Sequence, residues 1–236
     1  KFKQIREQAE IYKKEFGIKT EIYSKEEFNK IGHTGTEQYG AFSYKPGFAI
    51  NPLKFVNGIA KYALSKKLKI YDHTLVSKIE KNNNSYTLRT SEGSVNTKKI
   101  VVATNGFYQE GLVPQMNSRI LPVISNIIVT RKLTKNEIDL HNFKTYSPIM
   151  NTKNLLYYYR KLPDNRILFG TRGDFIGSDQ SNFNRSKKME KFFKNIFPDW
   201  SKISIDYSWR GFIAMSQKLT PSIGKIENEE IYYGFG

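Results

Sequence analysis

An uninterrupted apolar run, Ile100 to Ala103, ends in a tight corner of small residues, Thr104 to Gly106. Such a run, bounded by turn residues, is typical of a strand buried on both faces, as in a parallel sheet. Small side chains and glycine at the corner leave room for a phosphate or ribose to approach the backbone closely. The segment therefore favours an α/β fold, and by itself its corner fits an ordinary turn as well as a ligand-binding one.

Helices are predicted on both sides of this run, over residues 1–16, 25–30, 52–66 and 186–197. The second begins with a capping box, in which Ser24 is followed by Glu27. The third begins with Asn51 as N-cap and Pro52 at the first helical position. We expect this third helix to bury a stripe made of Leu53, Val56, Ile59, Ala60 and Ala63.

Strands are predicted wherever the apolar period changes to two, at residues 69–71, 75–81, 85–90, 121–130, 155–160, 166–170, 203–212 and 231–233. Asn82 to Asn84 and Pro163 to Asn165 are expected to be hairpin turns, because these residue types tolerate turn backbones. Residues 91–96 are expected as a polar turn and Thr220 to Gly224 as a loop. The later strands indicate a second, largely antiparallel unit, so the expected class is α/β (α+β).

The composition excludes several classes of protein. With 236 residues, 39% of them hydrophobic, the chain can bury a sizeable core. It has no cysteine, and its longest apolar runs are too short to span a membrane, so we expect no disulfide, no membrane span and a cytoplasmic location. The net charge of +16 comes mostly from scattered lysines, which favours a solvated basic surface over a nucleic-acid partner.

The usual catalytic motifs are missing from the sequence. His33, His73 and His141 are too widely separated to predict a metal site. The sequence contains no G-x-S-x-G nucleophile elbow and no P-loop. The segment from Gly32 to Gly35 follows a predicted helix instead of a strand, so it fails the context test for a dinucleotide fingerprint.

A series of ordered segments carries a stronger signal than any single motif. They are Phe42 to Leu53, Leu75 to Ile79, Ile100 to Gly106, Tyr157 to Arg160, Arg166 to Gly170, Trp209 to Gly211, Pro221 to Gly224 and Tyr232 to Gly236. In this order they resemble the flavin-dependent oxidoreductases of the D-amino-acid-oxidase-like superfamily, especially the gamma-glutamylputrescine oxidoreductase type. The resemblance implies part of a FAD-binding Rossmann-like domain with an inserted, mainly antiparallel substrate domain. Its expected divisions are 1–110 and 206–236 for the FAD-binding part and 111–205 for the substrate part.

The resemblance implies FAD as cofactor and assigns residues to it. The main chain of Val76 matches the position that meets the adenine, and the corner Ala103, Thr104, Asn105 and Gly106 matches the turn that lies against FAD. Pro221, Gly224, Gly234 and Gly236 match the loops that close over the flavin ring. The family's opening strand with G-x-G-x-x-G does not occur in residues 1–236, so we expect this stretch alone to be inactive.

The same resemblance points to a small-molecule amine as substrate. Tyr157, Tyr159 and Arg160 match a strand that lines the family's cavity, and Trp209 is a further candidate. Strand alternation places Tyr157 and Tyr159 on one face and Tyr158 with Arg160 on the other. Ile213 stands where related amino-acid oxidases carry a carboxylate-binding arginine, which favours an amine over a simple α-amino acid.

The mechanism implied is hydride transfer from the carbon next to the amine nitrogen to the flavin. No catalytic base is identified, and Lys161 is a candidate for assisting oxygen. Two other interpretations stay open. One is a tRNA-modifying FAD oxidoreductase of the same superfamily, for which the basic surface would bind RNA. The other is a non-catalytic interaction module that does not bind the cofactor.

Overall fold

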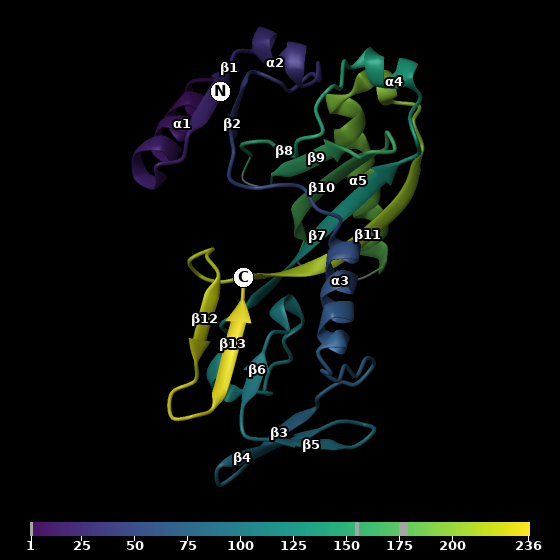
Figure 1. The fold of residues 1–236 in the computed structure, drawn as a ribbon. Helices are drawn as coiled ribbons and strands as arrows, with labels where there is room; N and C mark the ends of the chain where they lie inside the picture. Colours follow the sequence, from purple (N-terminus) through teal and green to yellow (C-terminus); the bar gives the residue numbers. More distant parts are fainter. Residues whose placement is uncertain (1, 154–155, 175–178) are drawn as a thin grey trace. The chain divides into compact units, whose positions relative to one another are not determined.

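A computed structural model describes residues 2–153, 156–174 and 179–236 (Figure 1). The chain forms two compact units, each assembled from separate stretches of sequence. Unit 1 contains residues 1–49 and 124–211, and unit 2 contains residues 50–123 and 212–236. The mixed α/β class with antiparallel sheets is confirmed. The expected division into flavin and substrate parts stays a prediction about function, because compactness alone does not show which residues bind a ligand.

The N-terminal part of unit 1 is a small helix and sheet layer. It comprises α1 (Phe2–Phe16), β1 (Thr20–Tyr23), α2 (Lys25–Ile31) and β2 (Ala41–Tyr44). The predicted capping box of α2 is confirmed, since the Ser24 side chain accepts from the Glu27 amide and the Glu27 carboxylate accepts from the Ser24 amide. The ring of Tyr12 on α1 packs against Phe42 and Tyr44, which fixes α1 on the two-stranded sheet.

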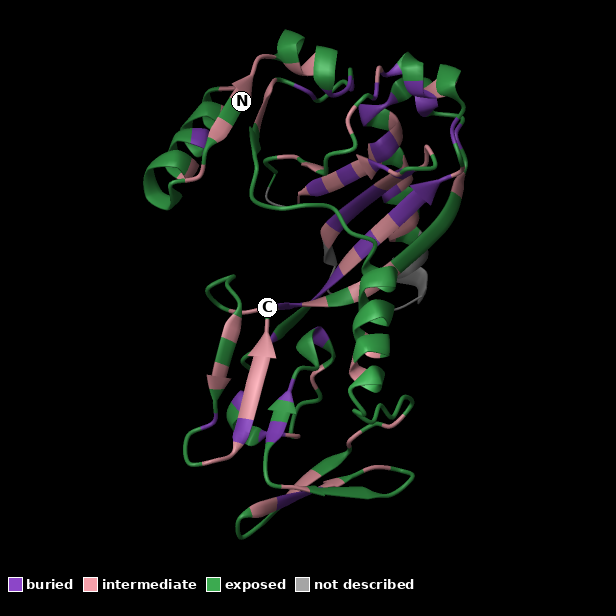
Figure 2. Ribbon diagram, in the orientation of Figure 1, coloured by how far each residue is buried: buried purple, intermediate pink, exposed green. Residues whose placement is uncertain are grey.

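The main sheet of unit 1 has five strands in the order β11-β7-β10-β9-β8. Their bounds are β7 (Leu121–Thr130), β8 (Ile149–Met150), β9 (Tyr157–Lys161), β10 (Ile167–Asp174) and β11 (Ile205–Met215). The helices of this part are α4 (Lys135–Leu140), α5 (Asp179–Ile196) and the short 3-10 turn η3 (Pro198–Trp200). The burial of β9 alternates residue by residue, as expected for a sheet with one face against a core (Figure 2).

The core of unit 1 is built mainly from aromatic rings. Phe193, Phe197 and Trp200 are fully buried and pack with Phe169 and Phe143. Such rings each bury a large apolar area and favour offset or edge contacts, so they account for much of the stabilisation of this unit.

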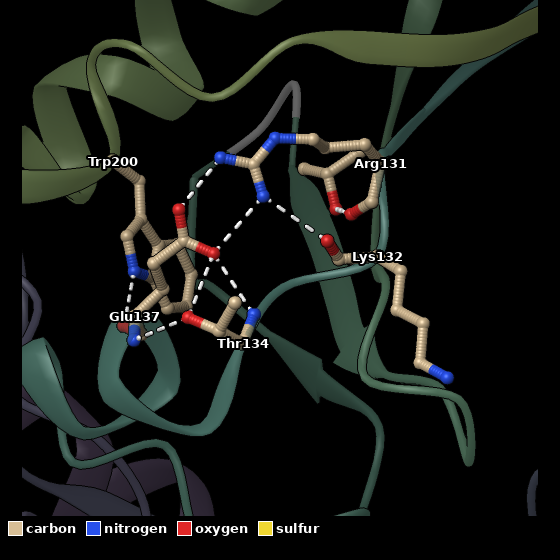
Figure 3. A network of polar contacts seen from close by, with 6 residues as sticks. Arg131, Lys132, Thr134, Glu137 and Trp200 are labelled. Carbon is tan, nitrogen blue, oxygen red and sulfur yellow. Dashed lines mark hydrogen bonds and ion pairs between the residues drawn. The ribbon is translucent and has the colours of Figure 1, made fainter.

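A polar network fastens the end of β7 to α4 and η3 (Figure 3). The Arg131 guanidinium donates to both carboxylate oxygens of Glu137, at 2.9 and 2.6 Å. The same carboxylate accepts from the Thr134 amide at 2.8 Å, which completes the N-terminal cap of α4. The Trp200 Nε1 donates to the Glu137 carbonyl at 2.7 Å, so one residue holds a strand end, a helix start and a buried indole together.

Unit 2 contains α3 (Pro52–Ser65) and two three-stranded sheets. One sheet is antiparallel, in the order β3-β4-β5, with β3 (Lys78–Asn82), β4 (Ser85–Arg89) and β5 (Ser94–Thr97). The other has the order β12-β13-β6, with β6 (Ile100–Val102), β12 (Ser222–Lys225) and β13 (Ile231–Phe235). The 3-10 turns η1 (Asn105–Phe107) and η2 (Pro114–Met116) follow β6.

Two expectations about burial in unit 2 are wrong. Helix α3 forms where predicted and Asn51 caps it, but Leu53, Val56 and Ile59 are 71%, 60% and 52% exposed (Figure 2). Val101 is 71% exposed, so β6 is not buried on both faces. Apolar periodicity shows which face of an element can be buried, and within unit 2 these faces are left uncovered.

Three local predictions of secondary structure, one strand, one turn and one loop, are also wrong. Residues 69–71 are not a strand, whereas Ser94–Thr97 and Ser222–Lys225 are strands where a turn and a loop were expected. The predicted start of the strand at residue 155 lies outside the described residues, and β9 begins at Tyr157. Among the described residues, no helix has both the length and the apolar character needed to cross a membrane.

Candidate functional site

The candidate cofactor site in unit 2 lies where two parallel strands end. β13 runs parallel to β6, with Ile231 opposite Ile100 and Tyr233 opposite Val102. The residues after β6, Ala103 to Gly106, and the end of β13 with Gly236 after it therefore lie at the same edge of the sheet. Ligands of open α/β sheets bind at such carboxyl ends.

A hydrogen bond joins these two segments directly. The backbone amide of Gly236 donates to Oδ1 of Asn105 at 3.2 Å, across 131 residues of sequence. Asn105 has φ +52°, in the left-handed region that asparagine tolerates better than most residues. The predicted corner and the final glycine are thus brought together, although the sequence distance between them is large.

Glycine is required at two positions of this edge because other backbone lies close. A Cβ on Gly236 would lie 2.7 Å from Cα of Pro221, and its φ of +129° is unfavourable for other residues. A Cβ on Gly106 would lie 2.9 Å from Cβ of Phe212. The corner is therefore packed closely against β11 at Phe212, and the residue after β13 is packed closely against the Pro221 segment.

The other predicted cofactor residues differ in their surroundings. Gly224 in β12 pairs with Tyr233, whose ring occupies the space that a side chain at Gly224 would need. Gly234 pairs with Ile223, and a Cβ there would meet nothing within 4 Å. Val76 is half-buried in the segment that leads into β3, a strand of the other sheet of unit 2.

The exposed part of the corner has the chemistry of a nucleotide site. Ala103, Thr104 and Asn105 are exposed, while Gly106 beneath them is buried. Small side chains, a hydroxyl and an amide can approach a ribose or phosphate without steric conflict, and turn backbones of this kind bind anions. These residues fit the group that the sequence predicted for them.

The predicted substrate residues of β9 divide between two faces in unit 1, as alternation predicted. Tyr157 and Tyr159 are each 8% exposed and belong to the aromatic core. The hydroxyl of Tyr159 lies 2.9 Å from Nε2 of His33, and burial raises the pKa of this tyrosine. Their surroundings are those of packing residues, and a substrate contact for either stays a prediction.

Tyr158 and Arg160 are half-buried on the opposite face of β9. The Tyr158 ring lies across Gly170 of β10, in the space where any other residue would place its Cβ. Its hydroxyl then reaches Ser125 Oγ on β7 at 2.8 Å. Strand alternation predicted that Tyr158 shares a face with Arg160, but Tyr158 was not among the predicted substrate residues. The missed signal was Gly170, which lies opposite Tyr158 in the strand register.

Trp209 and Lys161, the remaining candidates of unit 1, differ in exposure. Trp209 in β11 is 47% exposed. Lys161 is buried, with Nζ donating to the Phe143 carbonyl at 2.6 Å and lying 4.3 Å from the ring centroid of Tyr146. Burial lowers the pKa of Lys161. Its ammonium therefore serves to satisfy buried carbonyl groups of the chain.

Comparison with known proteins matches the whole chain to one family. The family described as DAO, FAD dependent oxidoreductase, matches residues 1–236. A probable oxidoreductase OrdL of Haemophilus influenzae is 29% identical over 211 residues, covering 86% of this chain and 46% of that protein. The gamma-glutamylputrescine oxidoreductase of Escherichia coli is 27% identical over 194 residues, covering 82% and 44%. The chain thus spans about half the length of these relatives.

Solved structures share the fold at low sequence identity. Glycine oxidase from Geobacillus kaustophilus superposes with a TM-score of 0.80 at 17% identity, covering 99% of this chain and 61% of that one. L-proline dehydrogenase from P. horikoshii gives a TM-score of 0.78 at 21% identity, covering 99% and 63%. These likenesses concern the fold alone.

Proposed function

The chain belongs to the FAD dependent oxidoreductase family, and from this premise we propose that the protein uses FAD to oxidise a small amine or amino acid. The observation that carries the proposal is the edge at which β6 and β13 end, where the Gly236 amide donates to Asn105. This bond joins two segments that the resemblance assigned independently to FAD.

The cofactor-binding role is proposed for the corner and for the glycines around it. Ala103, Thr104 and Asn105 are exposed and small enough to meet the nucleotide part of FAD. The role proposed for Gly106, Pro221 and Gly236 is indirect. The close packing at these residues would hold the backbone of the exposed corner in a fixed conformation. When bound, FAD supplies the hydride acceptor for the carbon next to the amine nitrogen.

The substrate-binding role is proposed for the face of unit 1 that carries Arg160 and Tyr158. Arg160 supplies a permanent positive charge, which suits a carboxylate or another anionic group of the substrate. Tyr158 supplies an aromatic surface whose position is fixed by Gly170 and by the bond to Ser125. Ile213 leaves no charge at the position that the resemblance links to α-carboxylates, so we favour an amine whose anionic group lies away from the reacting carbon. A γ-glutamylated amine has this character.

The decisive experiment uses the purified full-length protein. We expect it to be yellow, with the visible absorption bands of oxidised flavin. Under anaerobic conditions, γ-glutamylputrescine, glycine, L-proline and iminodiacetate would each be added in turn. Bleaching of the bands, fastest with γ-glutamylputrescine, is the expected result.

The same preparation separates the competing functions. A colourless protein that takes up no added FAD would contradict the proposed function and leave an interaction module. A yellow protein that no amine reduces, but that binds tRNA with steep salt dependence, would favour the RNA-modifying alternative. Faster bleaching by glycine or L-proline than by γ-glutamylputrescine would keep the enzyme class and reject the preferred substrate.

A further inference from the structure

The bond between Asn105 and Gly236 is a tertiary link between the ends of two parallel strands. β6 and β13 are paired as far as Val102 and Tyr233, where β6 ends while β13 continues beside β12 to Phe235. Beyond that point, the Asn105 side chain accepts from the Gly236 amide at 3.2 Å. This side-chain bond therefore connects the two segments beyond the point where their backbone pairing ends.

Two properties of Asn105 are needed for this link. Its backbone is left-handed, with φ +52°, which turns the chain out of β6 and into η1. Its side chain supplies the acceptor oxygen for Gly236. Asparagine is one of the few residues with a side chain that readily combines a left-handed backbone with a short carbonyl acceptor.

Gly236 is held on its other side by Pro221. A side chain at Gly236 would lie 2.7 Å from Cα of Pro221, so the glycine backbone is seated directly on this segment. Any shift of Gly236 away from Asn105 is therefore transmitted to the Pro221 segment. The side-chain acceptor of Asn105 therefore links the corner, through Gly236, to the Pro221 segment.

We propose that Asn105 is a positioning residue for the flavin, acting through Gly236 and not through contact of its side-chain oxygen with the cofactor. The proposal rests on the proposed function, because the corner and the Pro221 segment are the parts assigned there to FAD. It gives the side-chain oxygen of Asn105 a role separate from the nucleotide contact proposed above for the exposed residues Ala103, Thr104 and Asn105.

The chain offers a matched control for this bond. In the same unit, Oδ1 of Asn117 accepts from the backbone amide of Gly111 at 2.9 Å. This is the same pair of chemical groups, an asparagine carbonyl and a glycine amide, within the loop that follows η1. Removing this bond should loosen the loop around Gly111 and leave the conformation of the corner unchanged.

The experiment compares Asn105→Gly, Asn105→Ala and Asn117→Ala in the full-length protein. Asn105→Gly keeps access to the left-handed backbone and removes only the acceptor, whereas Asn105→Ala loses both. Apoprotein is titrated with FAD to obtain Kd, its melting temperature is measured separately, and the flavin absorption bands are recorded in the holoprotein. We expect Asn105→Gly to weaken FAD binding about five- to tenfold, as loss of one ordinary hydrogen bond predicts, and to shift the bands. Asn105→Ala should weaken binding further, and Asn117→Ala should leave Kd and bands unchanged.

The outcomes are distinct from failure of the proposed function. If the unchanged protein binds FAD but Asn105→Gly binds it equally well, the positioning role is overturned and the flavoenzyme assignment stands. If Asn105→Gly lowers the apoprotein melting temperature without moving the flavin bands, the residue is merely structural and the proposal also fails. If the unchanged protein binds no FAD, the proposed function itself has failed. Should Asn105→Ala not fold, the glycine variant still decides the question.

Discussion

The Nε2 atom of His33 lies 2.9 Å from the hydroxyl oxygen of Tyr159, and both side chains are buried in the aromatic core of unit 1. The amide of Gly35 donates to Nδ1 of the same ring at 2.9 Å. The neutral ring therefore carries its proton on Nε2 and donates it to Tyr159. Protonating Nδ1 would remove the acceptor from the Gly35 amide.

This arrangement predicts acid sensitivity. Burial, with a smaller effect of His141, lowers the pKa of His33 from about 6.5 to about 4. Because the unfolded chain then binds a proton at higher pH than the folded chain, the free energy of unfolding should fall as pH decreases from about 6.5 to about 4. The expected loss is roughly 3 kcal/mol. Chemical denaturation across this range should show that the free energy of unfolding of His33→Gln depends less steeply on pH than that of the unchanged protein. The control is His73→Asn, at an exposed histidine with φ +49°, which should show the same pH dependence as the unchanged protein. Equal slopes in all three proteins would reject the prediction.

Glu137 should be important for stability, because it joins Arg131, Thr134 and, through its carbonyl, Trp200. Replacing it in Glu137→Gln removes the two-point ion pair and should lower the free energy of unfolding by about 1–2 kcal/mol, a modest figure because the pair is partly exposed. Bonding to Arg131 lowers the pKa of Glu137 to about 2, so the contribution is present above pH 4.5 and is lost as pH falls towards 2. Glu190→Gln, which removes an ion pair within α5, is the control and should cost a few tenths of a kcal/mol. The prediction would be wrong if both variants unfolded at the same denaturant concentration.

Gly170→Ala should disturb the face of unit 1 that carries Tyr158. The new methyl group would occupy the space of the Tyr158 ring, so the ring must move and its bond to Ser125 is lost. We expect about 1–3 kcal/mol of destabilisation, as for other overpacked sites. Gly211→Ala is a matched strand control, because its Cβ would meet nothing within 4 Å. Adding Tyr158→Ala to Gly170→Ala should recover part of the loss in a double-mutant cycle; strictly additive effects would show that the two residues do not conflict.

Gly236→Ala should reduce the flavin content of the full-length protein. Its Cβ would press on the backbone of Pro221, which cannot rotate away as a side chain could. Gly234→Ala is the comparison, since the structure leaves space around that position. The flavin content of both variants would be measured by denaturing the proteins and quantifying the released flavin by absorption. Normal content in Gly236→Ala would contradict the close packing described here, whereas reduced content in Gly234→Ala alone would indicate that FAD fills the space at Gly234.

Arg160→Met should raise KM for substrates that carry an anionic group by roughly tenfold or more, the typical loss of a charge-assisted hydrogen bond. An uncharged amine analogue should be affected little, and flavin content should not change. Arg119→Met, at an exposed arginine of unit 2, removes the same charge elsewhere and serves as control. Steady-state kinetics with both substrates would decide; an equal effect on both substrates would remove Arg160 from anion recognition.

Local signals in the sequence predicted local structure well. The capping box at Ser24 and the Asn51-Pro52 start of α3 are each encoded within four residues, and both are confirmed. β5 and β12 were missed because their sequences are polar or glycine-containing, and they become strands only through pairing with β4 and β13. Pairing partners lie outside any short window of sequence.

The candidate site was predicted in its parts but not in its assembly. The sequence pointed to the corner and to the terminal glycines separately, and the hydrogen bond from Gly236 to Asn105 follows only from the parallel pairing of β6 and β13. Side chains on α3 and at Val101 had the right pattern for burial, but pattern does not say which partner covers a face. For Tyr158, the informative residue was Gly170, and register between β9 and β10 was needed to connect them.

The parallel pairing of β6 with β13 also determines when the corner can form during synthesis. Asn105 leaves the ribosome 131 residues before Gly236, so almost the whole of the stretch described here must be translated before the two can meet. Contacts between such distant residues close slowly because a long loop must be ordered first. The nascent chain therefore carries β6 without its parallel partner until β13 has been translated.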